Sequence, residues 1–346
     1  MAQGRGGLVW YVISAKRLKT WKCLSPVTAN GLTGPVTPRR VTPSAAVPTP
    51  QRSELVLASM LSGDEQRLVF SHLCSVLGPG AAVAFSSASS ELRTLTQAQQ
   101  QQLKAGHEAA TALGRKAGKG SCKELREAKR VEWDHKGLSV DEMATLGRLG
   151  SVLPVLEELR LSEPAAGPDG MQRLMAGLGV GAMPALATLE ISCLPVGDTG
   201  AASALAAALD RGALPRLKLL DLGNAGIGDA GLVALAPALR RRPALEELRL
   251  WGNPLGDEGL AALVAPPPPP AGAPPPPTRG LTKLKVLSLS YTQITDAGCA
   301  ALASALESGA LPALKNLFLR GIPASAAAKV TVQVAVGRDC MVLVLE

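Results

Sequence analysis

The chain has 346 residues, of which 47% are hydrophobic and only 3% aromatic. A core of Leu, Ala and Val with few rings suits stacked small units better than a domain built around large side chains. The net charge of +8 is concentrated: residues 1–53 hold eight of the 36 basic residues and no acid, so the remainder is neutral. Beyond the run Arg240–Arg242 that remainder lacks a basic face, which argues against nucleic acid as a partner.

The cysteine pattern indicates the cellular compartment, and the apolar runs indicate whether the chain can span a membrane. The six cysteines are widely spread and form no C-x-x-C pair, which favours free thiols in a reducing, intracellular compartment, cytoplasmic or nuclear. The longest apolar run near the start, Leu8–Ile13, is far shorter than the roughly 18 residues that a membrane-spanning helix needs. We therefore expect no membrane association.

Residues 1–53 are rich in Ser, Thr and Pro, with scattered Arg and Lys. This composition is typical of an organellar transit peptide, and equally of a disordered basic tail. Prolines from Pro26 onward forbid a long helix, so any targeting helix must lie within about Leu8–Lys22. Both interpretations stay open.

Residues 54–96 predict a small helical domain, because their apolar residues recur at helical spacing. The stretch Asp64–Leu73, followed by Pro79 and Leu92–Leu95, resembles an F-box, although Ser62 and Leu92 replace the Pro and Trp that are common in that motif. F-box domains grip the adaptor subunit of an SCF-type ubiquitin ligase, and they often carry leucine-rich repeats that hold a substrate. The resemblance implies that the adaptor contacts are Leu61, Leu68, Phe70, Leu73 and Pro79.

A generic three-helix cap over the first repeat is the alternative for this segment, because such apolar spacing is common in helical caps. Residues 97–124 are expected to form a polar helix and then a basic, glycine-rich connector exposed to solvent. The glycines and lysines of that connector do not match a phosphate-binding loop, and no strand precedes them.

From about residue 125 the chain is repetitive. The pattern L-x-x-L-x-L occurs six times in register, beginning at Leu156, Leu186, Leu217, Leu245, Leu284 and Leu314. One spacing is lengthened by a proline-rich insertion at 266–277, expected to be an exposed polyproline loop that serves as a spacer or docks a WW- or profilin-type module. Each copy predicts a short strand, a reversal marked by Gly-Asp, and an Ala- and Leu-rich helix whose first turn the Asp caps.

These repeats resemble the ribonuclease-inhibitor class of leucine-rich repeats. The resemblance implies an α/β solenoid over 125–346, a horseshoe with parallel strands inside and helices outside. The Asn that usually ends the strand survives only as Asn253, and its equivalents are Leu194, Ala225 and Thr292. Those other turns must satisfy their backbone groups by other means.

Atypical units are expected at both ends of the array, because a solenoid must cover its exposed core. Val131 and Trp133 fall in register 28 residues before the first copy, so Trp133 is predicted to point into the core. At the other end the register predicts a helix near 325–336 and a strand at 341–345. The β-branched residues there suggest instead a hairpin around Gly337–Asp339; we favour the register.

Function is expected on the concave side of the strands, where the residues between the leucines face solvent. Arg and aromatic side chains gather there, a composition typical of binding hot spots. Trp251 is the most prominent of them; the alternative is that its ring only folds over its own turn. The candidate partner-binding residues are Arg160, Glu190, Asp221, Arg249, Trp251, Tyr291, Phe318 and Arg320.

No catalytic constellation is evident. None of the three histidines has a partner at a spacing that recurs in catalytic or metal sites, and the pairs Glu157-Glu158 and Glu246-Glu247 are expected to be solvated on the strands. We therefore expect a protein-binding protein without cofactor or metal, not an enzyme. Three hypotheses stay open: a substrate-recruiting subunit of an SCF-type ligase, a plain interaction scaffold, and a GTPase regulator similar to the Ran GTPase-activating protein.

Overall fold

The computed structural model describes residues 76, 78–88, 90–192, 199–264, 280–337 and 340–343. The predictions for the tail and for the proline-rich loop lie outside these residues, as do four of the five F-box-like contacts, Leu61, Leu68, Phe70 and Leu73. The chain divides into two compact units. Unit 1 comprises residues 1–74 and 80–101, and unit 2 comprises residues 75–79 and 102–346.

The described part of unit 1 is helical. It contains α4 (Gly80–Ser86) and the first part of α5 (Ser90–Lys116), a helix that continues into unit 2. Ala82, Phe85 and Leu92 are buried, and the hydroxyl of Thr96 donates to the carbonyl of Leu92. The domain boundary that we expected between residues 96 and 97 falls inside α5.

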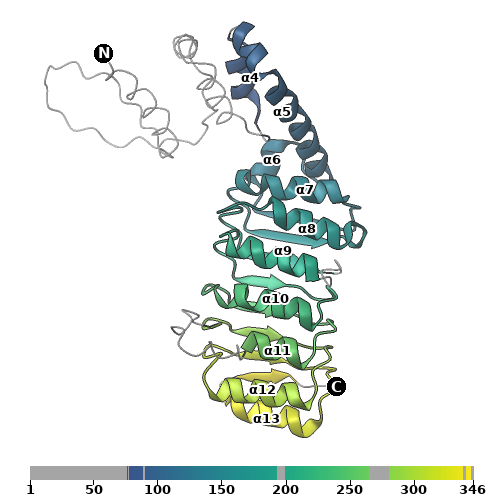
Figure 1. Ribbon diagram of the computed structural model, residues 1–346, viewed down its shortest axis with the longest axis vertical. Coiled ribbons are helices and arrows are strands. Elements are labelled where there is room, and N and C mark those ends of the chain that lie inside the picture. Colours follow the sequence, from purple (N-terminus) through teal and green to yellow (C-terminus); the bar gives the residue numbers. More distant parts are fainter. Residues whose placement is uncertain are drawn as a thin grey trace, which may run out of the picture. The chain divides into compact units, whose positions relative to one another are not determined.

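Unit 2 is a two-layer α/β solenoid in which strands and helices alternate along the chain (Figure 1). Eight parallel strands form one sheet in sequence order. They are β1 (Arg130–Asp134), β2 (Glu158–Ser162), β3 (Thr188–Ile191), β4 (Leu219–Asp221), β5 (Glu247–Arg249), β6 (Val286–Ser288), β7 (Asn316–Phe318) and β8 (Met341–Leu343).

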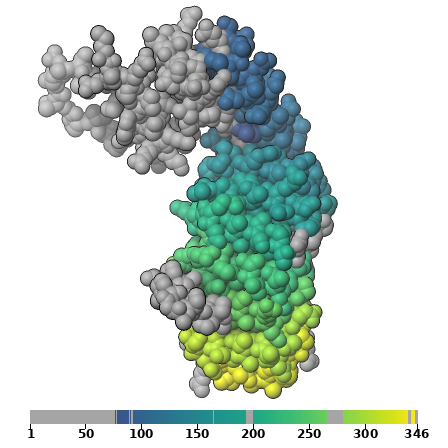
Figure 2. All heavy atoms as spheres, viewed as in Figure 1, coloured from purple at the N-terminus to yellow at the C-terminus, as the bar shows by residue number. Residues whose placement is uncertain are grey.

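The helices of unit 2 stack side by side in the same order (Figure 1). In the space-filling view the residues of this unit follow one another from teal through green to yellow (Figure 2). They are α6 (Cys122–Glu127), α7 (Val140–Leu149), α8 (Gly167–Gly177), α9 (Thr199–Asp210), α10 (Asp229–Arg240), α11 (Asp257–Val264), α12 (Asp296–Glu307) and α13 (Ala326–Val336), with short 3-10 turns at Gly150–Val152 and Pro164–Ala166. No helix among the described residues is long and apolar enough to cross a bilayer.

The strand register confirms the predicted repeats. Leu159, Leu189 and Leu220 are successive partners across the sheet, and every leucine or isoleucine of the six predicted triplets is buried. Burial of these aliphatic side chains between strands and helices is the main stabilising term, since each fully buried Leu contributes about 1.5–3 kcal/mol.

Both end units follow the register as well. Trp133 pairs with Leu161, is fully buried, and donates its indole N–H to the carbonyl of Leu113. At the other end α13 and β8 occupy the positions that the register predicts, and the alternative hairpin is wrong. The β-branched residues of α13 adopt a helix because this helix packs against α12 and buries Val332.

The Gly-Asp reversals correct one prediction. Asp229 and Asp257 are the first residues of their own helices, and they cap the helix of the next repeat instead. The Asp229 carboxylate accepts N–H bonds from Gly256 and Gly259 at 2.7 and 2.9 Å, at the start of α11. In the same way, the Asp257 carboxylate accepts the N–H of Thr295 at 2.8 Å.

The second glycine of each reversal explains why the carboxylate crosses to the neighbour. A Cβ on Gly259 would lie 2.7 Å from Asp229 Oδ1, and a Cβ on Gly298 would lie 2.2 Å from Asp257 Oδ1. Glycine therefore leaves room for the preceding repeat's carboxylate at the positive end of the helix. Each Asp carboxylate thus bonds the start of the next helix, and these bonds join successive repeats.

The basic run Arg240–Arg242 is used between helices. Arg240 donates to the carbonyl of Ala262 near the end of α11, and Arg242 donates to the carbonyl of Leu209 near the end of α9. Arg241 forms a bidentate pair with Asp210 at 2.7 to 3.1 Å. Guanidinium groups at helix C-termini satisfy orphan carbonyls and oppose the helix dipole.

Candidate binding face

The exposed face of the sheet carries one side chain from each strand in a continuous row. The register aligns these central residues across neighbouring strands, and from β1 to β7 the apolar residues on either side of each are buried. From β1 to β8 the row is Glu132, Arg160, Glu190, Asp221, Arg249, Ser288, Phe318 and Leu343. It changes character after β5, from charged to neutral and aromatic.

The charged part of the row is internally paired. Arg160 bridges Glu158 on its own strand and Glu190 on β3, at 3.1 and 3.0 Å. Arg249 repeats this arrangement, with Glu247 on its own strand and Asp221 on β4 at 3.3 Å. Because each guanidinium already has two carboxylates, this half of the face is stabilised without a partner.

Two pKa shifts follow from this arrangement. Burial raises the pKa of Glu190 above its ordinary value; the nearby Asp221 carboxylate also raises it, and Arg160 only partly opposes the shift. Burial alone would lower the pKa of Arg249, but Glu247 and Asp221 outweigh it and raise the pKa. Asp221 is fixed further, because its Oδ1 accepts the N–H of Gly223 at 2.9 Å.

Trp251 lies against the preceding repeat. A Cβ on Gly223 would lie 2.2 Å from the indole Cε2, so the ring rests on the Gly223 backbone and is only partly exposed. Absence of a side chain at Gly223 is what permits this contact. The ring thus covers the neighbouring turn and presents its other side outward.

Tyr291 leans toward the following repeat. Its ring lies over Gly321, where a Cβ would come within 2.5 Å of Cδ1, and the Arg320 guanidinium stands 5.8 Å from the ring centroid. The side chain is 52% exposed. Phe318 is partly exposed in the central row, so Tyr291, Phe318 and Arg320 form an aromatic and cationic patch with no ion pair among the described residues.

The turns after β4, β5, β6 and β7 adopt a left-handed backbone. Asn224, Gly252, Tyr291 and Gly321 occupy equivalent positions with φ of 51°, 69°, 57° and 65°. Glycine and asparagine adopt this region readily, whereas an ordinary L-residue pays about 1–2 kcal/mol. Tyr291 is therefore held in a strained conformation.

Asn253 satisfies two turns at once, as predicted for its own. Its amide Nδ2 donates to the carbonyls of Leu222 and Leu250, both at 2.8 Å, and its Oδ1 accepts from the N–H groups of Ala225 and Ile227. The Ala225 turn, which lacks its own Asn, is thus served by the next repeat.

Thr292, at the position equivalent to Asn253, bonds only the carbonyl of Leu289 with its hydroxyl. Leu194, the remaining equivalent, lies outside the described residues.

The carboxylates Glu158 and Glu247 were absent from the predicted site. The signal that could have revealed them is the repeated pentapeptide Glu-Glu-Leu-Arg-Leu at 157–161 and 246–250, which places Glu and Arg two residues apart on one strand face. The first Glu of each pair lies outside the row, where Glu157 pairs with Lys129 and Glu246 with Lys285, at 3.0 and 2.6 Å.

One polar contact was not indicated by sequence spacing. His107 Nδ1 lies 2.6 Å from the carbonyl of Val76 and 3.7 Å from Cys122 Sγ. Donation to the carbonyl occupies the nitrogen that faces the thiol, so this arrangement ties residue 76 to α5 and gives no base for the cysteine. Among the described residues no group of three or more His, Cys, Asp or Glu is placed to hold a metal ion.

One comparison, with protein-family models, agrees with the repeat architecture. The family model described as "Leucine Rich repeat" matches residues 214–236, 243–264 and 280–303. A search of curated proteins finds no match. Among solved structures, the crystal structure of the Rad7 and Elc1 complex in yeast matches at 14% identity with a TM-score of 0.28, covering 72% of this chain and 84% of that chain. The parallel strands of unit 2, which alternate with helices, are consistent with a leucine-rich-repeat solenoid.

Proposed function

We propose that the exposed sheet face of the solenoid binds a protein partner, and that Trp251, Tyr291, Phe318 and Arg320 make the central contacts. One observation carries the proposal: the cations of β2 and β5 are neutralised by carboxylates, whereas Arg320 forms no ion pair with a described residue and lies over the Tyr291 ring. Aromatic and Arg side chains of this kind are enriched among binding hot spots.

The geometry supports this choice in a second way. Trp251 and Tyr291 rest on glycines of neighbouring repeats, so their rings are held in place before a partner arrives. A preorganised aromatic side chain loses little conformational entropy on binding, which favours affinity. Arg249 and Arg160 would have to give up existing ion pairs to bind, so we expect them to frame the contact.

The experiment is affinity purification of the full chain from cells, with mass spectrometry of the retained proteins. The double variant Trp251→Ala, Phe318→Ala should lose the specific partners, since each hot spot contributes roughly 2 kcal/mol or more. The matched control is Arg160→Ala, on the same face in the charged part, which should retain them. Equal retention by all three proteins would overturn the proposal.

A finer proposal is that the chain recruits its partner to an SCF-type ubiquitin ligase through the F-box-like segment. Its support is the sequence alone, because Pro79 is the one proposed adaptor contact among the described residues. In the same purification, the variant Leu68→Asp, Phe70→Asp should lose the cullin and the adaptor subunit but keep the partners of the sheet face. Absence of both ligase subunits from the unaltered chain would leave an interaction scaffold.

A further inference from the structure

The first strand of the sheet leaves one edge unpaired. On either side of β1, the carbonyl of Lys129 accepts the N–H groups of Glu157 and Glu158, and the N–H of His135 donates to the carbonyl of Ser162. The backbone N–H and C=O groups of successive residues point to opposite sides of a parallel strand. Those of Arg130, Glu132 and Asp134 therefore point away from β2. No described residue forms a hydrogen bond with these outward backbone groups.

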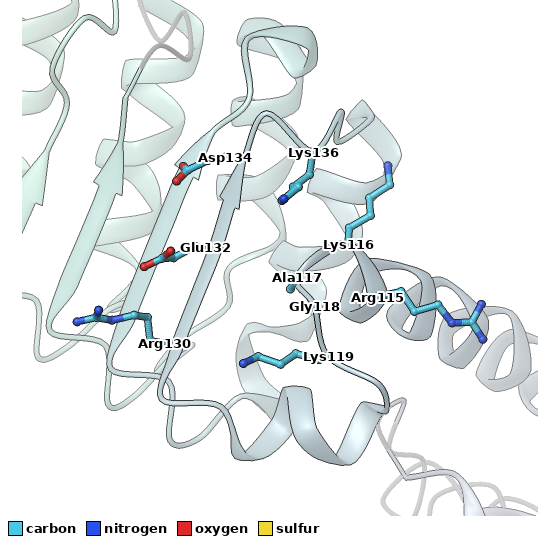
Figure 3. Close-up of a pocket in the computed structure, with 9 residues that line it drawn as sticks. All are labelled: Arg115, Lys116, Ala117, Gly118, Lys119, Arg130, Glu132, Asp134 and Lys136. Carbon is cyan, nitrogen blue, oxygen red and sulfur yellow. The ribbon is translucent and has the colours of Figure 1, made fainter.

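A cleft of about 640 Å³ runs beside this edge (Figure 3). One wall is β1, and the other is the segment 115–119 at the end of α5. The volume falls within the roughly 300–1,000 Å³ of ligand pockets. The bonds of Ala117, Gly118 and Lys119 are all made back to α5, so this segment lies near the edge without pairing with it.

The cleft is predominantly basic, with five Lys or Arg residues against Glu132 and Asp134. Lys116 is already engaged, at 2.8 Å from both the Gly137 carbonyl and Glu142. Lys119 and Lys136 direct their ammonium groups toward β1 in Figure 3, and neither has an ion pair with a described residue. Two free cations thus stand beside unpaired strand backbone.

We infer that this edge accepts an extended acidic peptide from a partner protein, which adds as a strand beside β1. Backbone pairing supplies affinity in such strand addition, and alternate side chains supply specificity. A peptide with acidic residues at every second position can place them all on the lysine side and neutral residues beside Glu132 and Asp134. The chain's own residues 1–53 do not fit, because they are basic and contain no acid.

The test uses the full chain and a fluorescent hexapeptide of alternating Glu and Val, followed by anisotropy at low salt. Three competitors distinguish the sources of affinity: the same peptide N-methylated at every amide, a Lys-Val peptide, and inorganic tripolyphosphate. We expect the Glu-Val peptide alone to bind well. In parallel, hydrogen exchange should slow at the amides of Glu132 and Asp134 when it is added, because these are the donors that the new strand occupies.

Two pairs of variants test the two walls. Lys119→Glu with Lys136→Glu should weaken binding at least about tenfold at low salt, whereas the distant exposed Lys315→Glu should not. Glu132→Pro removes one outward donor and leaves the bonds to β2 intact, so it should weaken binding about fivefold. The matched control Glu132→Gln keeps that donor and should bind at least as well as the unaltered chain.

Several outcomes would overturn the inference. Equal binding of the N-methylated peptide or of tripolyphosphate would reduce the cleft to a site for small anions. Protection of the Glu132 and Asp134 amides before any peptide is added would mean that the chain itself covers the edge. Absence of Glu-Val binding while circular dichroism shows a folded chain would also refute it.

Discussion

The two halves of the exposed sheet face are built differently. From β2 to β5 the central row is a ladder of Arg and carboxylates in which every charge has a partner. From β6 onward the row holds Ser288 and Phe318, with Tyr291 and Arg320 beside them and no ion pair among the described residues. Removing water from an ion pair on binding a partner costs free energy that the binding must recover. Burying exposed aromatic surface against a partner, in contrast, favours binding.

Equally conspicuous polar residues on one face can differ in role. Arg249 and Arg320 both look like contact residues in the sequence, but only Arg320 is free of carboxylates among the described residues. We therefore assign the ladder to stability and the aromatic part to binding.

The largest effect is expected at the border between the halves. Asn253→Ala removes the side chain that bonds four backbone groups of two turns, and it should destabilise the chain by about 3 kcal/mol. Thr292→Ala, at the equivalent position of the next repeat, should cost about 1 kcal/mol because one bond is lost. Urea unfolding followed by circular dichroism measures both, and equal losses would contradict the assignment.

A smaller effect separates the halves directly. Arg249→Ala leaves Asp221 and Glu247 without their cation and should cost about 1–2 kcal/mol of stability. Phe318→Ala, in the same row and partly exposed, should cost less than about 1 kcal/mol. In affinity purification, however, Phe318→Ala should lose more of the bound partners than Arg249→Ala. If Arg249→Ala were the milder change for stability and the more harmful one for binding, the division would be wrong.

Tyr291 should be almost neutral for stability. Tyr291→Asn places at φ 57° a residue that tolerates the left-handed region, as Asn224 does in an equivalent turn. Relief of about 1–2 kcal/mol of backbone strain should offset the lost ring contacts, leaving a net change below about 1 kcal/mol. Tyr291→Phe, which keeps the ring, is the control. A loss above about 2 kcal/mol for the Asn variant in urea unfolding would show that the ring is structural.

The smallest effect is a pH dependence. Because burial raises the pKa of Glu190 above 4.5 in the folded chain, its stabilising contribution is complete below pH 4.5 and is lost as the pH rises through the raised value. Glu190→Gln should therefore flatten the fall in unfolding free energy just above pH 4.5. Exposed Glu157→Gln, at the neighbouring repeat, provides the control. An identical pH profile for Glu190→Gln and the unaltered chain would mean that Arg160 cancels the shift.

Much of the fold was predictable from sequence, because a short strand with leucines at fixed spacing has only one way to bury them. The six copies set the strand order, the register and the end unit at Trp133. The same alternation placed Arg160, Glu190, Asp221, Arg249 and Phe318 in one row on the open face of the sheet, although Asp221 is buried there. Propensity alone would predict a strand for the β-branched residues of α13. Packing of this helix on the neighbouring repeat outweighs their helix-propensity penalty of a few tenths of a kcal/mol per residue.

Local features therefore follow from the sequence alone. They are the start of each strand, the side chains that point into the core, and the position of the helix that follows. The tertiary structure decided which neighbour each polar group meets. The Asp229 carboxylate bonds the next helix because Gly259 leaves room there, and the Trp251 ring rests on Gly223 for the same reason. Such choices depend on distances of a few tenths of an ångström between repeats about 30 residues apart, and hydrophobic spacing along one strand carries no information about them.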